Sequence, residues 1–133
     1  MTVIVSDAGF APETWTAGFD TESALDLTSD TDPASLSDQF AGVEMIRIDF
    51  PSFADGRGFT LARQLRLMGY TGRLRAKGHV LADQYAMARR TGFDEVEISD
   101  DLAARQPQEQ WLARSQWSAH NYQARLRGGS AAR

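Results

Sequence analysis

Alternating apolar and polar positions are clearest in the middle of the chain, and they predict strands there. Residues 43–50 (VEMIRIDF), 74–78 (LRAKG) and 93–98 (FDEVEI) have the period of two that is typical of β-strands. Between them, apolar residues recur with helical spacing in two segments, and these segments end at Gly69 and Gly92. Strand, helix, strand, helix, strand with short loops is typical of parallel strands joined by right-handed crossovers. We therefore expect an α/β fold with a small parallel βαβαβ sheet.

The first 42 residues have a weaker pattern. Residues 2–5 (TVIV) and 24–27 (ALDL) predict short strands. Asp32 before Pro33 is typical of an N-cap followed by proline at the first helical position, and it predicts a short helix through Phe40. The pattern does not fix how these pieces connect to the sheet.

Beyond the third central strand, two more helical segments are expected. Ser99 predicts an N-cap for a helical turn, and Pro107 predicts the start of a last helix, whose Trp111 we expect to pack on the domain. We interpret residues 1–124 as one α/β domain with its core in residues 43–112. Residues 125–133, which contain Gly-Gly-Ser-Ala-Ala, have the composition of a disordered tail.

One face of the predicted sheet is charged. Side chains of a strand alternate between its two faces. Four potential cations therefore share one side of the second central strand: Arg73, Arg75, Lys77 and His79. A sheet covered by helices on both faces would have continuous apolar strands instead. We therefore expect helices mainly on one face, as in a partial barrel, with a flavodoxin-like three-layer domain as the alternative. The charged face is then a groove, a partner interface or a solvated surface of Arg–Glu pairs.

Charge is divided unevenly along the chain. Residues 1–55 contain 11 acidic residues and one base, a net charge of −10, whereas residues 56–133 contain 13 bases and 7 acidic residues, a net charge of +6. Thirteen of the 14 bases are arginine, whose planar guanidinium suits carboxylate, phosphate or sulfur oxyanions. Two interpretations stay open: the two parts neutralise one another across a mixed surface, or the second part binds an anion.

Several classes of function are excluded or disfavoured by composition. The chain has no cysteine, which excludes disulfides, thiolate metal sites and cysteine nucleophiles within it. No segment approaches the roughly 20 apolar residues of a membrane span, and the N-terminus has no basic region before an apolar run. We expect a cytoplasmic protein without a membrane partner. The acidic first part and the single lysine argue against binding to nucleic acid.

The motif Asp55-Gly56-Arg57-Gly58 precedes the first central helix. Asp55 is expected to cap this helix, the glycines allow close approach of the backbone, and Arg57 is placed to reach an anion bound there. The motif matches neither the P-loop nor the dinucleotide fingerprint. A glycine-containing turn with a capping aspartate is an equal alternative.

Ligands of open α/β sheets usually bind beyond the carboxyl ends of the strands. We therefore assign four anion-contacting candidates, namely Arg57, Arg75, Lys77 and His79. The supporting positions are Asp55, Gly56, Gly58, Asp83 and Gln84, of which the last two are expected to orient Arg75 or Arg57. Histidine titrates near neutrality, so His79 also suits proton transfer. No spacing typical of a metal site or of a nucleophile–base pair is present, so no metal, cofactor or catalytic residue is assigned.

Residues 46–98 resemble the bacterial domain-of-unknown-function family 934, through residues 50–58 (FPSFADGRG), 74–78 (LRAKG) and 83–84 (DQ). Members of that family are often labelled as probable oxidoreductases of sulfite reduction, because they are encoded beside components of assimilatory sulfite reductase. The resemblance thus implies a pathway and no reaction. The positions that recur in the family match these residues of the chain: Asp55, Gly56, Arg57, Gly58, Leu65, Arg66, Arg75, Gly78, Asp83 and Gln84.

From the charged face and this resemblance, we expect an accessory or small-oxyanion-binding protein in assimilatory sulfite reduction. The alternative is a non-catalytic interaction module that docks on a sulfite-reductase subunit through the charged sheet face. An oxidoreductase acting alone is a third possibility, but it would need a flavin, haem or metal centre for which the sequence has no recognisable site. Whether the chain is an enzyme, and in which oligomeric state it acts, stays open.

Overall fold

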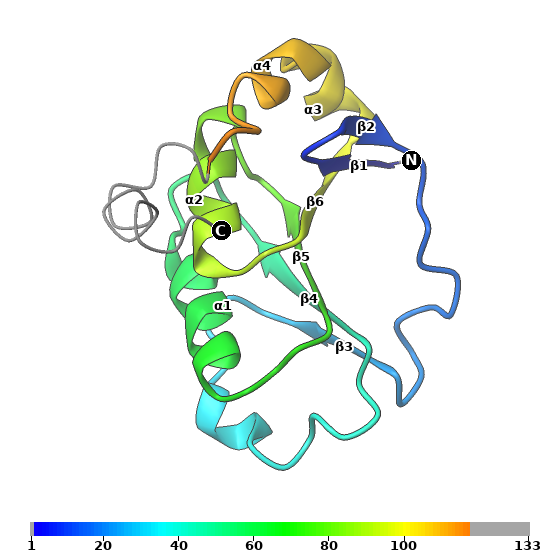
Figure 1. Ribbon diagram of the computed structural model, residues 1–133, viewed down its shortest axis with the longest axis vertical. Helices are drawn as coiled ribbons and strands as arrows, with labels where there is room; N and C mark the ends of the chain where they lie inside the picture. Colours follow the sequence, from blue (N-terminus) through cyan, green and yellow to red (C-terminus); the bar gives the residue numbers. More distant parts are fainter. Residues whose placement is uncertain (1, 118–133) are drawn as a thin grey trace, which may run out of the picture.

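The computed structural model describes residues 2–117, and a six-stranded open sheet is their central element (Figure 1). The strands lie in the order β2-β1-β6-β5-β4-β3. Their bounds are β1 Thr2–Ser6, β2 Gly9–Ala11, β3 Ala24–Leu27, β4 Met45–Phe50, β5 Arg73–Gly78 and β6 Glu95–Ser99. Strands β3 to β6 are parallel to one another, whereas β1 is antiparallel to β6 and β2 is antiparallel to β1. The expected α/β class with a parallel βαβαβ unit is confirmed.

Helices α1 and α2 lie together on one side of the sheet, while the connection between β2 and β3 runs on the other side (Figure 1). The helical bounds are η1 Pro33–Leu36, α1 Arg57–Leu67, η2 Ala82–Gln84, α2 Tyr85–Thr91, α3 Asp100–Arg105 and α4 Gln108–Leu112, where η denotes a 3₁₀ helix. Within residues 2–117 no helix covers the second face. The arrangement is therefore the expected one with helices mainly on one face, and it differs from the flavodoxin-like three-layer alternative.

The core lies between the sheet and these helices because one face of every parallel strand is apolar. Ile48, Leu74 and Val96 are completely buried there, and burying such a side chain stabilises the fold by about 1.5–3 kcal/mol. The Phe50 ring lies 4.9 Å from Phe59 of α1, centroid to centroid. The second residue of α1 is Gly58, where a Cβ would overlap the Phe50 ring. Glycine at this position allows α1 to approach the sheet closely.

The observed elements differ from the predicted ones mainly before residue 45. The expected helix from Pro33 to Phe40 is a shorter 3₁₀ helix, although its N-cap is confirmed, since Asp32 Oδ1 accepts a hydrogen bond of 3.0 Å from Ala34 N. Strand β2 was not expected, and neither was the pairing of β1 with β6. Strands β1 and β2 extend the sheet beyond β6, at the edge opposite β3.

The expectations for the other end of the chain hold within the described residues. Ser99 caps α3 by accepting a hydrogen bond of 3.1 Å from Leu102 N, and α4 follows Pro107. Trp111 is buried with its ring edge-on to Tyr85. The expected disordered tail, residues 125–133, lies outside the described residues. None of the helices in residues 2–117 has the length and apolar character needed to cross a bilayer.

Candidate functional site

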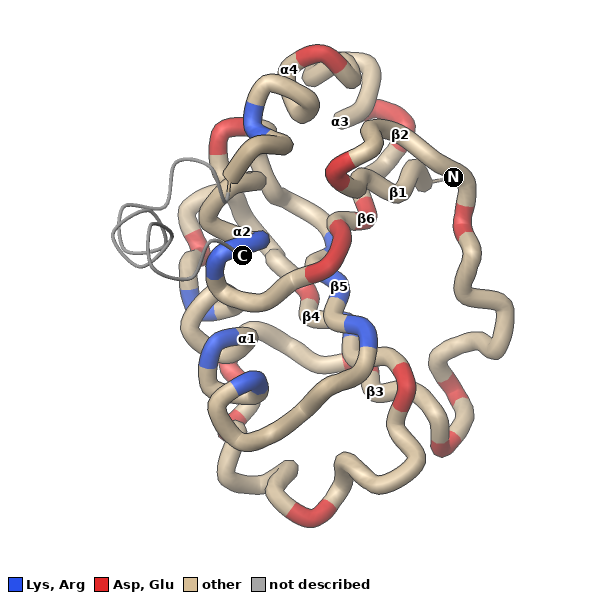
Figure 2. The backbone as a smooth tube through the Cα atoms, viewed as in Figure 1, with Lys and Arg blue, Asp and Glu red and all other residues tan. Residues whose placement is uncertain are grey.

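Figure 2 shows basic and acidic positions side by side along the central strands. On the face of the sheet without helices, these charges form a cluster centred on Arg75 of β5. The Arg75 side chain has 0% exposure. Its Nη1 and Nη2 atoms each donate a hydrogen bond of 2.6 Å to the carboxylate of Glu13, Nε donates to Glu95 at 2.6 Å, and Nη1 also donates to Glu97 at 2.9 Å. Every nitrogen of the guanidinium is therefore engaged inside the protein.

Two kinds of contact build this cluster. Glu95 stands directly opposite Arg75 in the parallel register of β5 and β6, so the sheet itself pairs them. Glu13 comes from the irregular segment 12–23 between β2 and β3, which is called the strap below. Hydrogen bonds from Arg75 lower the pKa of Glu13 to about 2. Burial alone would lower the pKa of Arg75, but its bonds to Glu13 and Glu95 raise this pKa above its ordinary value.

The arginines beside Arg75 are neutralised in the same way. Arg47 of β4 pairs with Asp26 at 2.7 Å and with Glu97 at 3.1 Å, and its guanidinium carbon lies 3.6 Å from the centroid of the Phe19 ring in the strap. Arg73 pairs with Glu95 at 2.8 Å. The charged face predicted from the strand pattern thus exists, but its arginines are matched by carboxylates and are partly covered by the strap.

Arg57, the second anion-contacting candidate, lies apart from this cluster at the start of α1. Its guanidinium donates to both carboxylate oxygens of Asp55, at 3.0 and 2.8 Å, and 62% of its side chain is exposed. These bonds, with others from Arg57 N and Ser29 Oγ, hold the pKa of Asp55 well below its ordinary value. Gly56 occupies the N-cap position and Asp55 precedes it, but Asp55 Oδ1 accepts a hydrogen bond of 3.1 Å from Arg57 N, so the expected capping of the first residue of α1 is present.

Lys77 and His79 form no ion pair within residues 2–117. Lys77 stays on the charged face of β5. His79 is exposed at the carboxyl end of β5, because Gly78 has a φ of +110° and interrupts the alternation of the strand. The Nδ1 atom of His79 lies 3.2 Å from the carbonyl oxygen of Phe50, and the imidazole is edge-on to the Phe53 ring at 5.1 Å. The ring is thereby held with Nε2 directed away from its Phe50 contact.

The supporting residues Asp83 and Gln84 bond neither Arg75 nor Arg57 within the described part of the chain. Asp83 pairs with Arg114 at 2.8 Å on the surface. Gln84 joins two loops: its Oε1 accepts from Leu81 N at 2.8 Å, and its Nε2 donates to the carbonyl oxygen of Phe53 at 3.3 Å. Gln84 therefore supports the carboxyl edge of the sheet next to His79.

A pocket of about 300 Å³ opens at this carboxyl edge, where β5 and β6 end. The residues that line it are Phe53, Gly78, His79, Ser99, Asp101, Leu102 and Arg105. The polar side chains among them are His79, Ser99, Asp101 and Arg105, and the Arg105 guanidinium is paired with Asp101 at 2.8 Å. Sequence reasoning missed Arg105, because an exposed arginine on a short helix carries no pattern that distinguishes it from other surface arginines.

A family model described as a bacterial protein of unknown function, DUF934, matches residues 24–132. The chain belongs to this family. The match begins at β3, so it includes Arg75, His79 and the carboxyl-edge pocket, while β1, β2 and the strap precede it. No curated protein and no solved structure matches the chain. Since the description of the family names no activity, the function is argued below from the site.

Proposed function

We propose that this member of DUF934 is an accessory protein of assimilatory sulfite reduction that binds a small oxyanion in the carboxyl-edge pocket. The observation that carries the binding site is that His79 and Arg105 line the same pocket beyond the strand ends. Helix-flanked parallel sheets commonly bind ligands at this edge. The pathway is carried over from the family resemblance described above.

The chemistry of the two side chains supports an oxyanion. Arg105 donates from a planar fork that suits two oxygens of an anion, and its present partner Asp101 is an exposed neighbour one turn away. Such a surface pair contributes little, so an oxyanion can replace Asp101 at low cost. The Nδ1–H group of His79 faces the Phe50 carbonyl oxygen, so Nε2 donates to an oxyanion in the protonated imidazolium form, in a direction set by the Phe50 and Phe53 contacts.

The other expected anion residues suit this role less well. Arg75 would have to give up buried carboxylate partners, which leaves uncompensated charge in the protein. Arg57 is already joined to Asp55 by two hydrogen bonds. Lys77 forms no ion pair within residues 2–117, but it lies on the charged face and does not line the carboxyl-edge pocket.

Isothermal titration calorimetry with sulfite and with sulfate tests the site. We expect one anion per chain, with the affinity reduced at least about tenfold by His79→Gln and by Arg105→Gln, because each removes a charge-assisted hydrogen bond. The matched control is Arg57→Gln, which should leave the affinity unchanged. Absence of binding, or equal affinity in all these variants, would contradict the site.

The pathway has a separate test in the organism that encodes the chain. A deletion strain is expected to lose growth on sulfate as sole sulfur source and to grow normally on cysteine. Normal growth on sulfate would remove the assignment to sulfite reduction while leaving anion binding to be decided by calorimetry.

Docking on a sulfite-reductase subunit is the second candidate, and one observation favours it at the same edge. Phe53 and Leu81 expose 38% and 37% of their surface, and Gln84 bridges their loops. Paired exposed apolar side chains beside a polar pocket are typical of a contact surface. Copurification with the reductase that is lost in a Phe53→Ser, Leu81→Ser double variant, and kept in His79→Gln, would favour docking over anion binding.

A further inference from the structure

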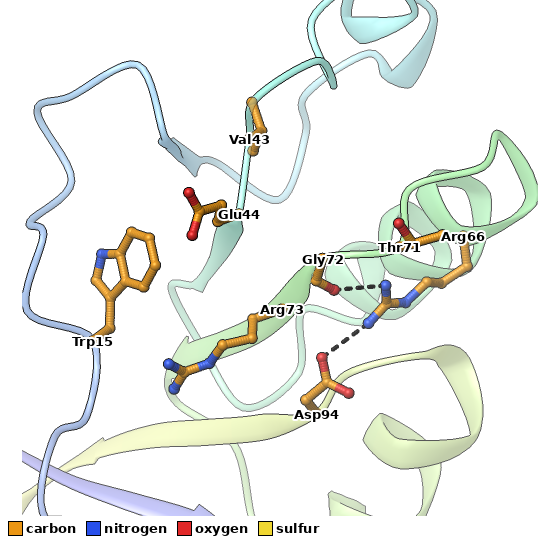
Figure 3. A pocket seen from close by; sticks show the side chains of 8 residues that line it. All are labelled: Trp15, Val43, Glu44, Arg66, Thr71, Gly72, Arg73 and Asp94. Carbon is orange, nitrogen blue, oxygen red and sulfur yellow. Dashed lines mark hydrogen bonds and ion pairs between the residues drawn. The ribbon is translucent and has the colours of Figure 1, made fainter.

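A second pocket lies at the opposite end of the sheet, where β4 and β5 begin, and its volume is about 620 Å³ (Figure 3). The residues that matter for its chemistry are Trp15 from the strap, Glu44, Arg66, Arg73 and Asp94. This pocket shares no lining residue with the carboxyl-edge pocket. An inference drawn from it is therefore independent of the proposed oxyanion site.

Arg66 and Asp94 are committed to the fold and form one wall of the pocket (Figure 3). The Arg66 guanidinium donates to the carbonyl oxygens of Tyr70, Gly72 and Gly92 at 2.8 to 3.0 Å, and to Asp94 at 3.0 Å. Asp94 also accepts a hydrogen bond from Leu74 N at 3.0 Å. Binding a ligand would cost Arg66 and Asp94 hydrogen bonds that hold the fold together, so we assign neither side chain to a ligand.

Glu44 and Arg73 have unused hydrogen-bonding capacity. The backbones of these residues are joined, since Arg73 N donates to the Glu44 carbonyl oxygen at 2.9 Å. Both side chains line the pocket, yet they form no ion pair with each other, and within residues 2–117 the Glu44 carboxylate has no ion pair at all. Arg73 uses Nη2 for Glu95 and Thr14, and no hydrogen bond within the described residues engages its Nε or Nη1.

Trp15 provides an aromatic wall beside these two charges (Figure 3). Its Nε1 atom donates to the Gly18 carbonyl oxygen at 2.7 Å, so the polar atom of the indole is satisfied. Its backbone N donates to Glu13 Oε2 at 2.9 Å, and the same carboxylate is held by Arg75. The buried cluster on the charged face thus positions Trp15 at the pocket, through the strap.

We propose that this pocket binds a zwitterionic α-amino acid. The ligand ammonium pairs with the Glu44 carboxylate and lies beside the face of Trp15, whose π-system attracts cations. The ligand carboxylate accepts a charge-assisted hydrogen bond from Nη1 of Arg73, while Nη2 stays with Glu95 and Thr14. A simple anion would be repelled by Glu44 and a simple cation would leave Nη1 of Arg73 without an acceptor, whereas a molecule with both charges satisfies both residues.

Titration with each standard L-amino acid in turn tests the proposal, with binding measured by calorimetry and by tryptophan fluorescence. We expect at least one amino acid to bind. The amine that lacks its carboxylate and its N-acetyl derivative should each bind at least about tenfold more weakly, since each loses one charge-assisted contact. The fluorescence change should disappear in Trp15→Phe, because Trp111 and Trp117 do not line the pocket.

Two variants decide whether the binding occurs in this pocket. Glu44→Gln should weaken binding about tenfold without affecting folding, since this side chain has no ion pair to lose, and Glu109→Gln on α4 is the matched control that should have no effect. Arg73→Lys should weaken binding by removing the Nη1 donor, with folding checked by circular dichroism. Failure of every amino acid to bind at millimolar concentration, or unchanged affinity in Glu44→Gln, would overturn the proposal.

Discussion

The two faces of the sheet are buried by different kinds of side chain. Under α1 and α2, Ile48, Leu74 and Val96 are buried by other apolar side chains. On the other face, Arg75 is just as inaccessible, but it is buried by carboxylates and by the strap, which has no regular secondary structure. The first face is held by non-directional packing that tolerates exchange of similar side chains, whereas the second depends on a few directional ion pairs.

This difference changes the interpretation of the arginine-rich strand. A charged strand face invites an assignment as a ligand site, and Arg75 was the central candidate. Because the charge of Arg75 is paired within the chain, substitution of Arg75 primarily changes the stability of the fold, and its effect on ligand binding is secondary. The residues that can bind a ligand without breaking a buried ion pair lie near the two ends of the strands. They are His79 and Arg105 at the carboxyl end, and Glu44 and Arg73 at the other end.

The largest effect on the charged face is expected from Arg75→Ala. The variant leaves Glu13, Glu95 and Glu97 close together without their common cation, and breaking a buried ion pair by removing one partner costs about 3–5 kcal/mol. In urea unfolding, this destabilisation should appear as a lower midpoint concentration of urea. Arg57→Ala is the matched control and should leave the midpoint unchanged, because its side chain is exposed. A loss of less than about 1 kcal/mol in Arg75→Ala would show that the cluster is dispensable.

A smaller effect is expected on the helix-covered face from Gly58→Ala. The added methyl group would overlap the Phe50 ring, and overpacking of a core costs about 1–3 kcal/mol. Gly56→Ala, two residues earlier in the same motif, is the control, since the nearest atom to its Cβ would be a Phe59 carbon at 4.0 Å. Thermal unfolding of the two variants separates them. Equal melting temperatures would mean that α1 shifts to accommodate the methyl group.

The smallest effect concerns pH and the strap. The pKa of Glu13 is about 2 in the folded protein, against an ordinary value of 4.5. Between these values the unfolded chain binds a proton that the folded chain does not, so the stability contributed by Glu13 is present above pH 4.5 and is lost as the pH falls toward 2. Because 38% of the side chain is exposed, we expect a contribution of about 1 kcal/mol.

Unfolding of the native protein and of Glu13→Gln, measured across that pH window, should show their difference in stability shrinking as the pH falls. Glu109→Gln, an exposed position on α4, controls for the general effect of losing one carboxylate. A difference that stays constant with pH would mean that Glu13 does not hold the strap through its charge.

The elements from Met45 to Leu112 could be predicted from the sequence because their signals are local. Strand alternation, a helical repeat, Gly69 and Gly92 at helix ends and the Ser99 cap all act within a few residues. Strand β2 has only three residues, too few for a periodic pattern. The pairing of β1 with β6 joins residues at opposite ends of the chain, and no local pattern records it.

The candidate sites were harder to predict for the same reason. The period of two placed Arg73, Arg75 and Lys77 on one face correctly. The period of two could not show that Glu13 would neutralise Arg75. Glu13 lies 62 residues before Arg75, in a segment without periodicity. The His79 contact with the Phe50 carbonyl likewise depends on the turn at Gly78, which has a left-handed backbone. Glycine permits this conformation but does not require it, so the sequence alone does not predict the contact.

The antiparallel pairing of Val3 with Ile98 and of Val5 with Val96 also has a consequence for how the chain is made. Strand β1 emerges early from the ribosome, but its partner β6 is synthesised more than ninety residues later, which at 5–20 residues per second is a delay of roughly 5–20 s. During that interval the apolar strand TVIVS can pair with the three-residue strand β2, but its other edge has no partner. Closing so long a loop makes this pairing a late, slow step of folding, and the unpaired edge of β1 stays exposed to aggregation until that step is complete.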